Sequence, residues 1–151
     1  MQLHFATIEC PLGEGYPPVS NPMIERASQR LDGFELTRSQ MNDRIFEIGH
    51  LGINRFFSLD SACYRAGALH GRTKELLGLV SSLVLRCNDC VDYHLVQCVD
   101  VGWSDAEIHD ALNVGLVVGG SIVIPHLRHA VATLDALRAR EAKIGTAADG
   151  D

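Results

Sequence analysis

The segment between Lys74 and Arg86 constrains the fold more than any other part of this chain. Apolar residues occupy nearly every side of a helix drawn through it: Leu76, Leu77, Leu79, Val80, Leu83, Val84 and Leu85. A helix that is hydrophobic all round is buried among other elements of a protein. The segment therefore predicts a central helix, with further secondary structure packed around it.

The N-terminal third of the chain predicts an arm followed by a helical hairpin. Four of the five prolines lie between Cys10 and Pro22, so we expect residues 1–21 to form an irregular arm. Helical periodicity follows over about residues 22–31, breaks at Asp32-Gly33 and resumes near Thr37. This pattern predicts two short helices that pack against each other.

The remaining helices are marked by their ends as well as by their period. They are expected at about residues 54–65, 89–101 and 105–118, and from residue 121 or 125 to residue 142. Gly102 is placed as a helix C-cap, and Ser104 with Glu107 matches a capping box. No segment alternates with the period of a strand, so we predict an all-α bundle of about six to seven helices. Residues 143–151 should be a disordered tail.

Length and charge bound the organisation and the partners. The 151 residues, 46% of them hydrophobic, suit a single domain over 1–151. A net charge of -6 repels nucleic acid and anionic lipid. No secretory signal opens the chain, and the longest apolar run, Val114 to Pro125, is too short to span a membrane, so we expect a cytoplasmic protein. That run is better suited to the core or to an interface between subunits of a homo-oligomer.

The residues Cys87, Cys90 and His94 form the motif C-x-x-C-x-x-x-H. In a reducing cytosol such a pair indicates redox or metal chemistry rather than a structural bridge. Cys90 and His94 are four residues apart and share a helix face, whereas Cys87 lies about 10 Å of helix rise from the histidine. We therefore predict that Cys90 is the attacking thiolate, stabilised by the helix N-terminus, and that Cys87 resolves it.

Glu75 is a carboxylate near the start of the apolar helix. Along a straight helix it would lie about 18 Å from Cys87, too far to act with it. If the chain reverses around residues 86–88, the two helices run antiparallel and Glu75 can orient or relay protons for His94. Spacing alone leaves open that Glu75 is an exposed residue of a first helical turn, favoured by the helix dipole.

Glu75, Cys87, Cys90 and His94 together resemble the E-x11-C-x-x-C-x-x-x-H signature of the alkylhydroperoxidase D-like proteins of the carboxymuconolactone decarboxylase family. The likeness runs from Arg55 to Leu137. Within it, the stretches RFFSLDSACYRAG and GGSIVIPHL resemble a small hexameric subgroup.

The resemblance implies an all-helical subunit, assembly into trimers or hexamers, and an antioxidant peroxidase of the peroxiredoxin type. In that family the second cysteine attacks a hydroperoxide and the first resolves it, which corresponds to Cys90 and Cys87. The glutamate and the last histidine relay protons, which corresponds to Glu75 and His94. No flavin, haem or nucleotide motif is present, so we expect no cofactor and an external dithiol, lipoyl or thioredoxin-like reductant.

One position departs from the family pattern. Alkylhydroperoxidase D itself carries a histidine just before the second cysteine, where this chain has Asp89. A carboxylate beside the nucleophile raises a thiol pKa by like-charge repulsion, which opposes the effect of the helix terminus.

The sequence leaves three other interpretations open. A carboxymuconolactone decarboxylase-type lyase needs no cysteine pair, and a redox-sensing helical oligomer would cycle the pair without turning over a substrate. A zinc site built on the cysteine pair, with His94 as its third ligand, would need a fourth ligand from Cys10, Cys63 or His126, which are scattered along the chain. We interpret Cys63 and Cys98 as small core residues, and His126 and His129 as hydrogen-bonded structural groups.

Overall fold

The described residues form a purely helical structure. A computed structural model describes residues 21–148 of the chain, and no strand occurs among them. The elements in chain order are α1 (Pro22–Glu47), α2 (Leu51–Cys63), α3 (Gly71–Val84), α4 (Asn88–Asp100), α5 (Asp105–Gly119), the 3₁₀ helix η1 (Ser121–Val123) and α6 (Ile124–Ala148). The prediction of an all-α fold is confirmed.

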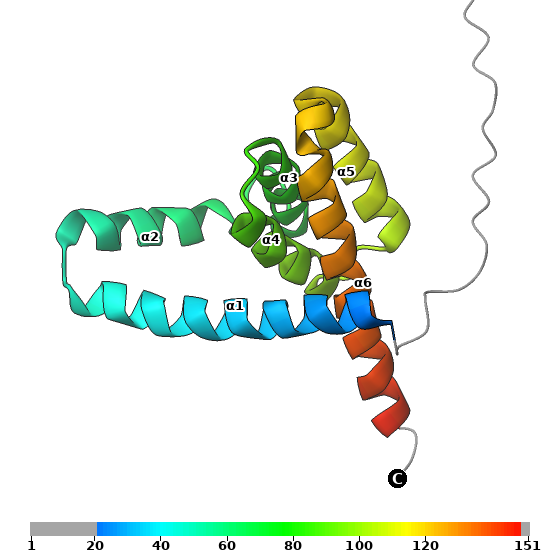
Figure 1. The fold of residues 1–151 in the computed structure, drawn as a ribbon. Coiled ribbons are helices and arrows are strands. Elements are labelled where there is room, and N and C mark those ends of the chain that lie inside the picture. Colours follow the sequence, from blue (N-terminus) through cyan, green and yellow to red (C-terminus); the bar gives the residue numbers. More distant parts are fainter. Residues whose placement is uncertain (1–20, 149–151) are drawn as a thin grey trace, which may run out of the picture.

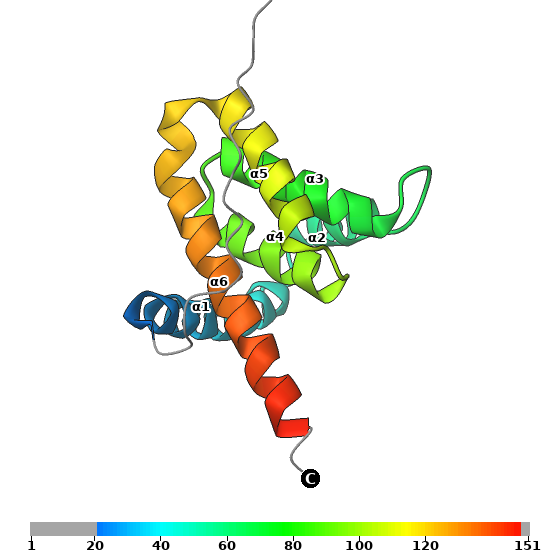
Figure 2. The ribbon, with the colours of Figure 1, turned by 90° about the vertical axis from the view of Figure 1, so that its right-hand side faces the viewer.

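Helices α3 to α6 form the body of the molecule, and α1 crosses one side of it (Figure 1). Helix α3 packs against α4 and α5, and α6 packs against α4. The first half of α1 packs against α6 (Figures 1 and 2), while its second half projects from the body together with α2 (Figure 1). The core lies between the body helices and includes Leu79, Leu83, Leu95, Ile108, Leu112 and Leu134.

The predicted helix ends of α4 and α5 are confirmed. Gly102 follows α4 with a φ of 79°, a left-handed conformation that glycine adopts without steric cost. At the start of α5, the Ser104 hydroxyl accepts from the Glu107 amide, and the Glu107 carboxylate accepts from the Ser104 amide. These local signals worked because each is satisfied by neighbouring residues alone.

The predicted break at Asp32-Gly33 is wrong, because α1 runs without interruption through it. Arg140 of α6 holds this part of α1, since its guanidinium donates to the Ser28 carbonyl and to the Asp32 carboxylate. Leu31 is fully buried beside them. Packing against α6 thus overrides the weak helix propensity of an Asp-Gly pair.

The central helix α3 is buried on one side only, which corrects the expectation of burial all round. Leu79 and Leu83 are fully buried, but Leu77 is 52% exposed and Leu85, just after the helix, is 75% exposed. The reason is that α2 projects away with α1, so only α4 and α5 contact α3 closely.

The C-terminal end of the chain differs from the disordered tail predicted for residues 143–151. Helix α6 continues to Ala148, so Lys143 to Ala148 is helical rather than an irregular tail. Residues 149–151 and the predicted arm up to residue 20 lie outside the described residues. No helix between residues 21 and 148 combines the length and apolar character that crossing a bilayer requires.

Candidate active site

The cysteine motif occupies the turn between α3 and α4. Arg86 adopts a φ of 60°, which reverses the chain after α3, and Cys87 is the N-cap of α4. The Cys87 sulfur accepts from the Cys90 amide at 3.3 Å, and the two residues form a disulfide with a Cα–Cα distance of 5.3 Å. Cys90 lies in the first turn of α4 and is exposed, so its sulfur can meet a dissolved reactant.

Glu75 and His94 are brought together by the antiparallel packing of α3 and α4. The His94 Nδ1 lies 2.9 Å from Glu75 Oε2, and the two residues are only 7% and 8% exposed. The expected proximity is confirmed, and the alternative of an exposed Glu75 is wrong. A carboxylate at Nδ1 favours the tautomer whose proton is on that nitrogen, so Nε2 carries no proton and acts as an acceptor.

Gly78 explains how the imidazole fits against α3. A Cβ added at this position would lie 2.5 Å from His94 Cε1 and 2.7 Å from Nε2. The absence of a side chain here lets the ring approach the α3 backbone this closely while its Nδ1 reaches Glu75 on the same helix. Gly78 was not singled out from the sequence, although a glycine inside an apolar helix can indicate that a neighbouring group lies close to the helix backbone.

Tyr64, which caps the C-terminus of α2, contacts the other side of the imidazole. Its hydroxyl lies 3.3 Å from His94 Nε2. Burial and the charge of Glu75 raise the pKa of Tyr64, so the phenol keeps its proton. The Lys74 ammonium fixes this segment by donating to the carbonyls of Cys63 and Arg65, each at 2.7 Å. No spacing rule connects Tyr64 with the motif, and it was not predicted.

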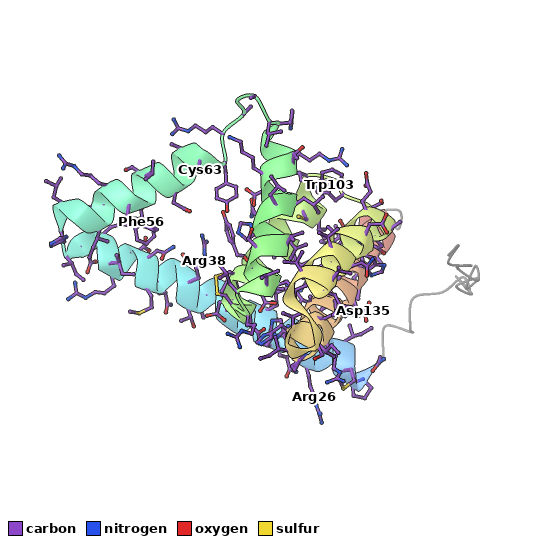
Figure 3. All side chains as sticks on the ribbon, turned by 90° about the horizontal axis from the view of Figure 1, so that it is seen from above. Arg26, Arg38, Phe56, Cys63, Trp103 and Asp135 are labelled. Carbon is purple, nitrogen blue, oxygen red and sulfur yellow. A yellow bond between two sulfur atoms is a disulfide. The ribbon has the colours of Figure 1, made fainter. Side chains whose placement is uncertain are left out.

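A pocket of about 660 Å³ joins these groups. Its walls come from α1, from the end of α2 and from the start of α4 (Figure 3). The lining residues are Arg30, Gly33, Phe34, Thr37, Arg38, Met41, Asp60, Tyr64, Asp89, Cys90, Tyr93 and His94. Cys90 and His94 thus open into one cavity, whereas Cys87 is not among its lining residues.

A buried carboxylate network lies behind this pocket. Asp92, 2% exposed, accepts from His129 Nε2 at 2.8 Å and from Thr133 Oγ1 at 2.6 Å, and the Arg30 guanidinium lies at 3.5 Å. Burial by itself would raise the pKa of Asp92, but the two hydrogen bonds and the charges of His129 and Arg30 lower it below its ordinary value. The network ties α4 to α6 and α1.

The two histidines of α6 are both hydrogen-bonded. His129 belongs to the Asp92 network, and His126 Nδ1 lies 2.8 Å from Asn88 Oδ1 at the start of α4. Neither lines the pocket. The prediction that both are hydrogen-bonded is confirmed.

The two cysteines outside the pair differ from each other. Cys98 is fully buried, as predicted, and burial raises its pKa to about 12, so this thiol is inert. Cys63 was also predicted to lie in the core, and that prediction is wrong. It is exposed because α2 projects from the body and buries none of its residues. Among residues 21–148, no three His, Cys, Asp or Glu side chains are grouped so that they could hold a metal ion.

Comparison with known proteins covers the same part of the chain. The model of the carboxymuconolactone decarboxylase family matches residues 53–133, which contain the whole C-x-x-C-x-x-x-H motif and Glu75. An uncharacterized protein in the cox locus of Paracoccus denitrificans is 28% identical over 80 residues, which cover 53% of this chain and 72% of that protein.

Solved structures agree with this match. Two crystal structures of one Thermotoga maritima protein share 56% sequence identity with the chain, with TM-scores of 0.72 and 0.71. They cover 74% of this chain and 97% and 94% of their own, and a role in an antioxidative response has been suggested for that protein. A Legionella pneumophila protein of the same family, 23% identical over 76% of this chain and 96% of its own, has a TM-score of 0.59 and supports the fold alone.

Proposed function

Because this chain belongs to the carboxymuconolactone decarboxylase family, we propose that it is a thiol-dependent hydroperoxide reductase with an antioxidant role. The observation that carries the proposal is that Cys90 and His94 line one pocket while Glu75 lies behind the imidazole at 2.9 Å. A lyase of the kind that gives the family its name has no use for a redox-active pair. The T. maritima relative, for which an antioxidative role has been suggested, supports the same choice.

The first step is attack of the Cys90 thiolate on a peroxide oxygen. His94 accepts the thiol proton at Nε2, because its Nδ1 proton is held by Glu75. The sulfur supplies two electrons, the O–O bond breaks, and His94 returns the proton to the departing alkoxide. Cys90 is left as a sulfenic acid and an alcohol is released. Tyr64, 3.3 Å from Nε2, keeps the ring oriented toward the pocket.

The second step regenerates the disulfide described above. The Cys87 thiol gives up its proton, its sulfur attacks the Cys90 sulfur, and the S–O bond of the sulfenic acid breaks. The departing hydroxide takes up the proton from Cys87 and leaves as water. Turnover then requires two electrons and two protons from outside. We propose an external dithiol, lipoyl or thioredoxin-like reductant for this, and a cytoplasmic location, where such dithiols are available.

We also propose that the chain works as a homo-oligomer, a trimer or a hexamer. Support comes from apolar side chains at the end of α5 and on η1 that are open to solvent in one chain. Val117 is 77% exposed, Val118 is 70% exposed and Ile122 is 60% exposed. Large apolar side chains left exposed close together in the chain are typical of protein interfaces.

Single-turnover kinetics test the reaction. Fully reduced protein is mixed with hydroperoxide, and the thiols are mapped by mass spectrometry over time. The wild type should consume peroxide and form the Cys87–Cys90 disulfide. Cys90→Ser should abolish consumption, and Cys87→Ser should stop at the sulfenic acid.

Cys63→Ser serves as the matched control, because Cys63 is exposed like Cys90 but lies outside the motif. It should react as fast as the wild type. Consumption no faster than that of free thiol, or consumption that survives Cys90→Ser, would overturn the peroxidase proposal and leave a lyase or a redox sensor.

A further inference from the structure

One wall of the pocket is a continuous strip of α1. Phe34, Arg38 and Met41 are separated by four and three residues, so they share one face of the helix. Arg30 lies one turn before Phe34 on the same strip. The strip exists only because α1 is unbroken at Gly33. It offers a ligand an apolar surface with a guanidinium group set between the apolar side chains.

The two arginines of this wall have different partners. Arg30 is committed to the Asp92 network, in which it contacts Thr133 as well as Asp92. Arg38 extends from α1 toward α4, where its guanidinium lies 4.3 Å from the centre of the Tyr93 ring (Figure 3). None of the ion pairs found among residues 21–148 includes Arg38.

Other charges of the pocket do not neutralise this guanidinium directly. Asp60 and Asp89 line the same cavity, but neither lies within ion-pair distance of Arg38. Besides lying over the ring, Arg38 makes a side-chain hydrogen bond with Tyr93. A guanidinium has five N–H donors in a planar fork, so one bond to Tyr93 leaves other N–H groups that can donate to a carboxylate. Arg38 is therefore positioned to bind an anionic group of a ligand.

The position of Tyr93 relates this anion site to the reactive sulfur. Tyr93 follows Cys90 by three residues on α4, so the two side chains are neighbours on the helix surface. A ligand with its anionic group at Arg38 can lie along Phe34 or Met41 and present another group to Cys90. The pocket, at about 660 Å³, is within the size range of sites for small organic ligands.

We infer that the pocket selects organic hydroperoxides that carry a carboxylate, and that Arg38 binds this carboxylate. The inference rests on the peroxidase proposed above and names its substrate class. The carboxylate is unchanged in the reaction, because the two electrons pass from the Cys90 sulfur to the O–O bond and the product is the corresponding hydroxy acid.

Competing substrates give the kinetic test. The rates of Cys90 oxidation by linoleic acid hydroperoxide and by its methyl ester are measured, both substrates below their critical micelle concentrations. The reduced proteins are the wild type, Arg38→Gln, Arg38→Lys and Arg44→Gln. Wild type should react about tenfold faster with the acid, the effect of one charge-assisted hydrogen bond. Arg38→Gln should bring the acid-to-ester ratio near one, and Arg38→Lys should restore part of it.

The quantity compared between variants is the ratio of the rate with the acid to the rate with the ester. A general loss of activity lowers both rates equally and leaves this ratio unchanged. Arg44→Gln removes an exposed arginine that is also on α1 but pairs with Glu47, and it should keep the wild-type ratio. Equal rates with the acid and the ester in the wild type, or the same loss of preference in Arg44→Gln, would overturn the inference.

A binding experiment separates this inference from the peroxidase itself. Octanoate and octanamide are titrated by calorimetry into the disulfide form of the wild type and of Arg38→Gln. Octanoate should bind to the wild type but not to Arg38→Gln, and octanamide should bind to neither protein. If the reduced protein consumes no hydroperoxide, the peroxidase proposal fails while Arg38-dependent octanoate binding still establishes the carboxylate site. If hydroperoxides are consumed but octanoate does not bind, the site fails and the peroxidase stands.

Discussion

At the scale of single residues, His94 connects everything that the proposed chemistry needs. It donates to Glu75 on one side, contacts the Tyr64 hydroxyl on the other and lies on the bare backbone of Gly78. Cys90 precedes it by one turn on the same helix face. The ring position is thus fixed by contacts from three directions, which is how a proton-transfer group is held in a productive geometry.

Gly78→Ala tests that arrangement. Alanine at an interior helix position ordinarily stabilises a protein by about 0.5–1 kcal/mol relative to glycine. Here the added Cβ would lie 2.5 Å from the imidazole, so the ring must move and its bond to Glu75 must lengthen. We expect the rate of Cys90 oxidation to fall about 100-fold, the usual scale of a lost acid–base group.

Two measurements check the cause of this loss. Stopped-flow kinetics give the rate of Cys90 oxidation. Proton NMR compares the chemical shift of the His94 Nδ1 proton, which its hydrogen bond to Glu75 moves downfield, between the variant and the wild type. Ser81→Ala, on the exposed side of the same helix, is the control and should change neither. A Gly78→Ala protein with wild-type kinetics and an unmoved Nδ1 signal would contradict the role given to Gly78.

At the scale of the elements, α1 is placed by polar contacts as much as by apolar ones. Arg140 of α6 fixes it beside Asp32, and Arg30 joins it to the Asp92 network. A smaller apolar cluster of Ile24, Ala27 and Ala136 fills the crossing of the two helices. The pocket wall formed by α1 therefore depends in part on ion pairs, and the one with Arg30 involves the buried carboxylate of Asp92, whose charge depends on pH.

Asp92→Asn tests this dependence. The pKa of Asp92 is lowered in the folded protein from its ordinary value of 3.8, so the charged form stabilises the fold. That contribution is fully present above pH 3.8 and is lost as the pH falls through the lowered pKa. Asp92→Asn should reduce the free energy of unfolding at pH 7 by about 1–3 kcal/mol, since it weakens a buried charged hydrogen-bond network.

Urea unfolding between pH 2 and pH 7 provides the measurement. The difference between wild type and Asp92→Asn should shrink toward acid pH. Asp110→Asn, an exposed aspartate of α5, should follow the wild type throughout. A constant difference between wild type and Asp92→Asn at every pH would show that the charge of Asp92 does not stabilise the fold.

At the scale of the whole molecule, the second half of α1 and all of α2 stand away from the body (Figure 1). Helix α2 buries none of its residues, and Leu51, Phe56 and Leu59 are 61%, 68% and 69% exposed. An isolated pair of helices gains little stability from such side chains while water surrounds them. A second copy of the chain that covers them would complete the fold, in agreement with the proposed homo-oligomer.

Leu59→Glu tests the assembly. Light scattering after size-exclusion chromatography should give the wild type a mass of three or six times 16.5 kDa. A charge at Leu59 should shift this mass to a smaller species, because a carboxylate cannot be buried in an apolar contact without a partner. Ser58→Glu adds the same charge at the neighbouring exposed position and should leave the assembly intact. A monomeric wild type would contradict the proposal.

Local chemistry determined the parts of the fold that the sequence predicted well. The period of the apolar residues placed the helices, and the caps at Gly102 and Ser104 placed two of their ends. The four-residue spacing from Cys90 to His94, with a turn before it, brought Glu75 into the predicted site. These features need only near neighbours along the chain, so one sequence is enough to recognise them.

The features that depend on contacts between segments far apart in the sequence were decided only by the tertiary structure. Tyr64 reaches His94 from 30 positions away in the sequence, and Arg140 holds α1 across a separation of 108. The unbroken α1, the exposed side of α3 and the place of Arg38 over Tyr93 follow from such contacts. Each depends on which helix surfaces face each other, and helix periodicity shows where an apolar face lies but not which other face covers it.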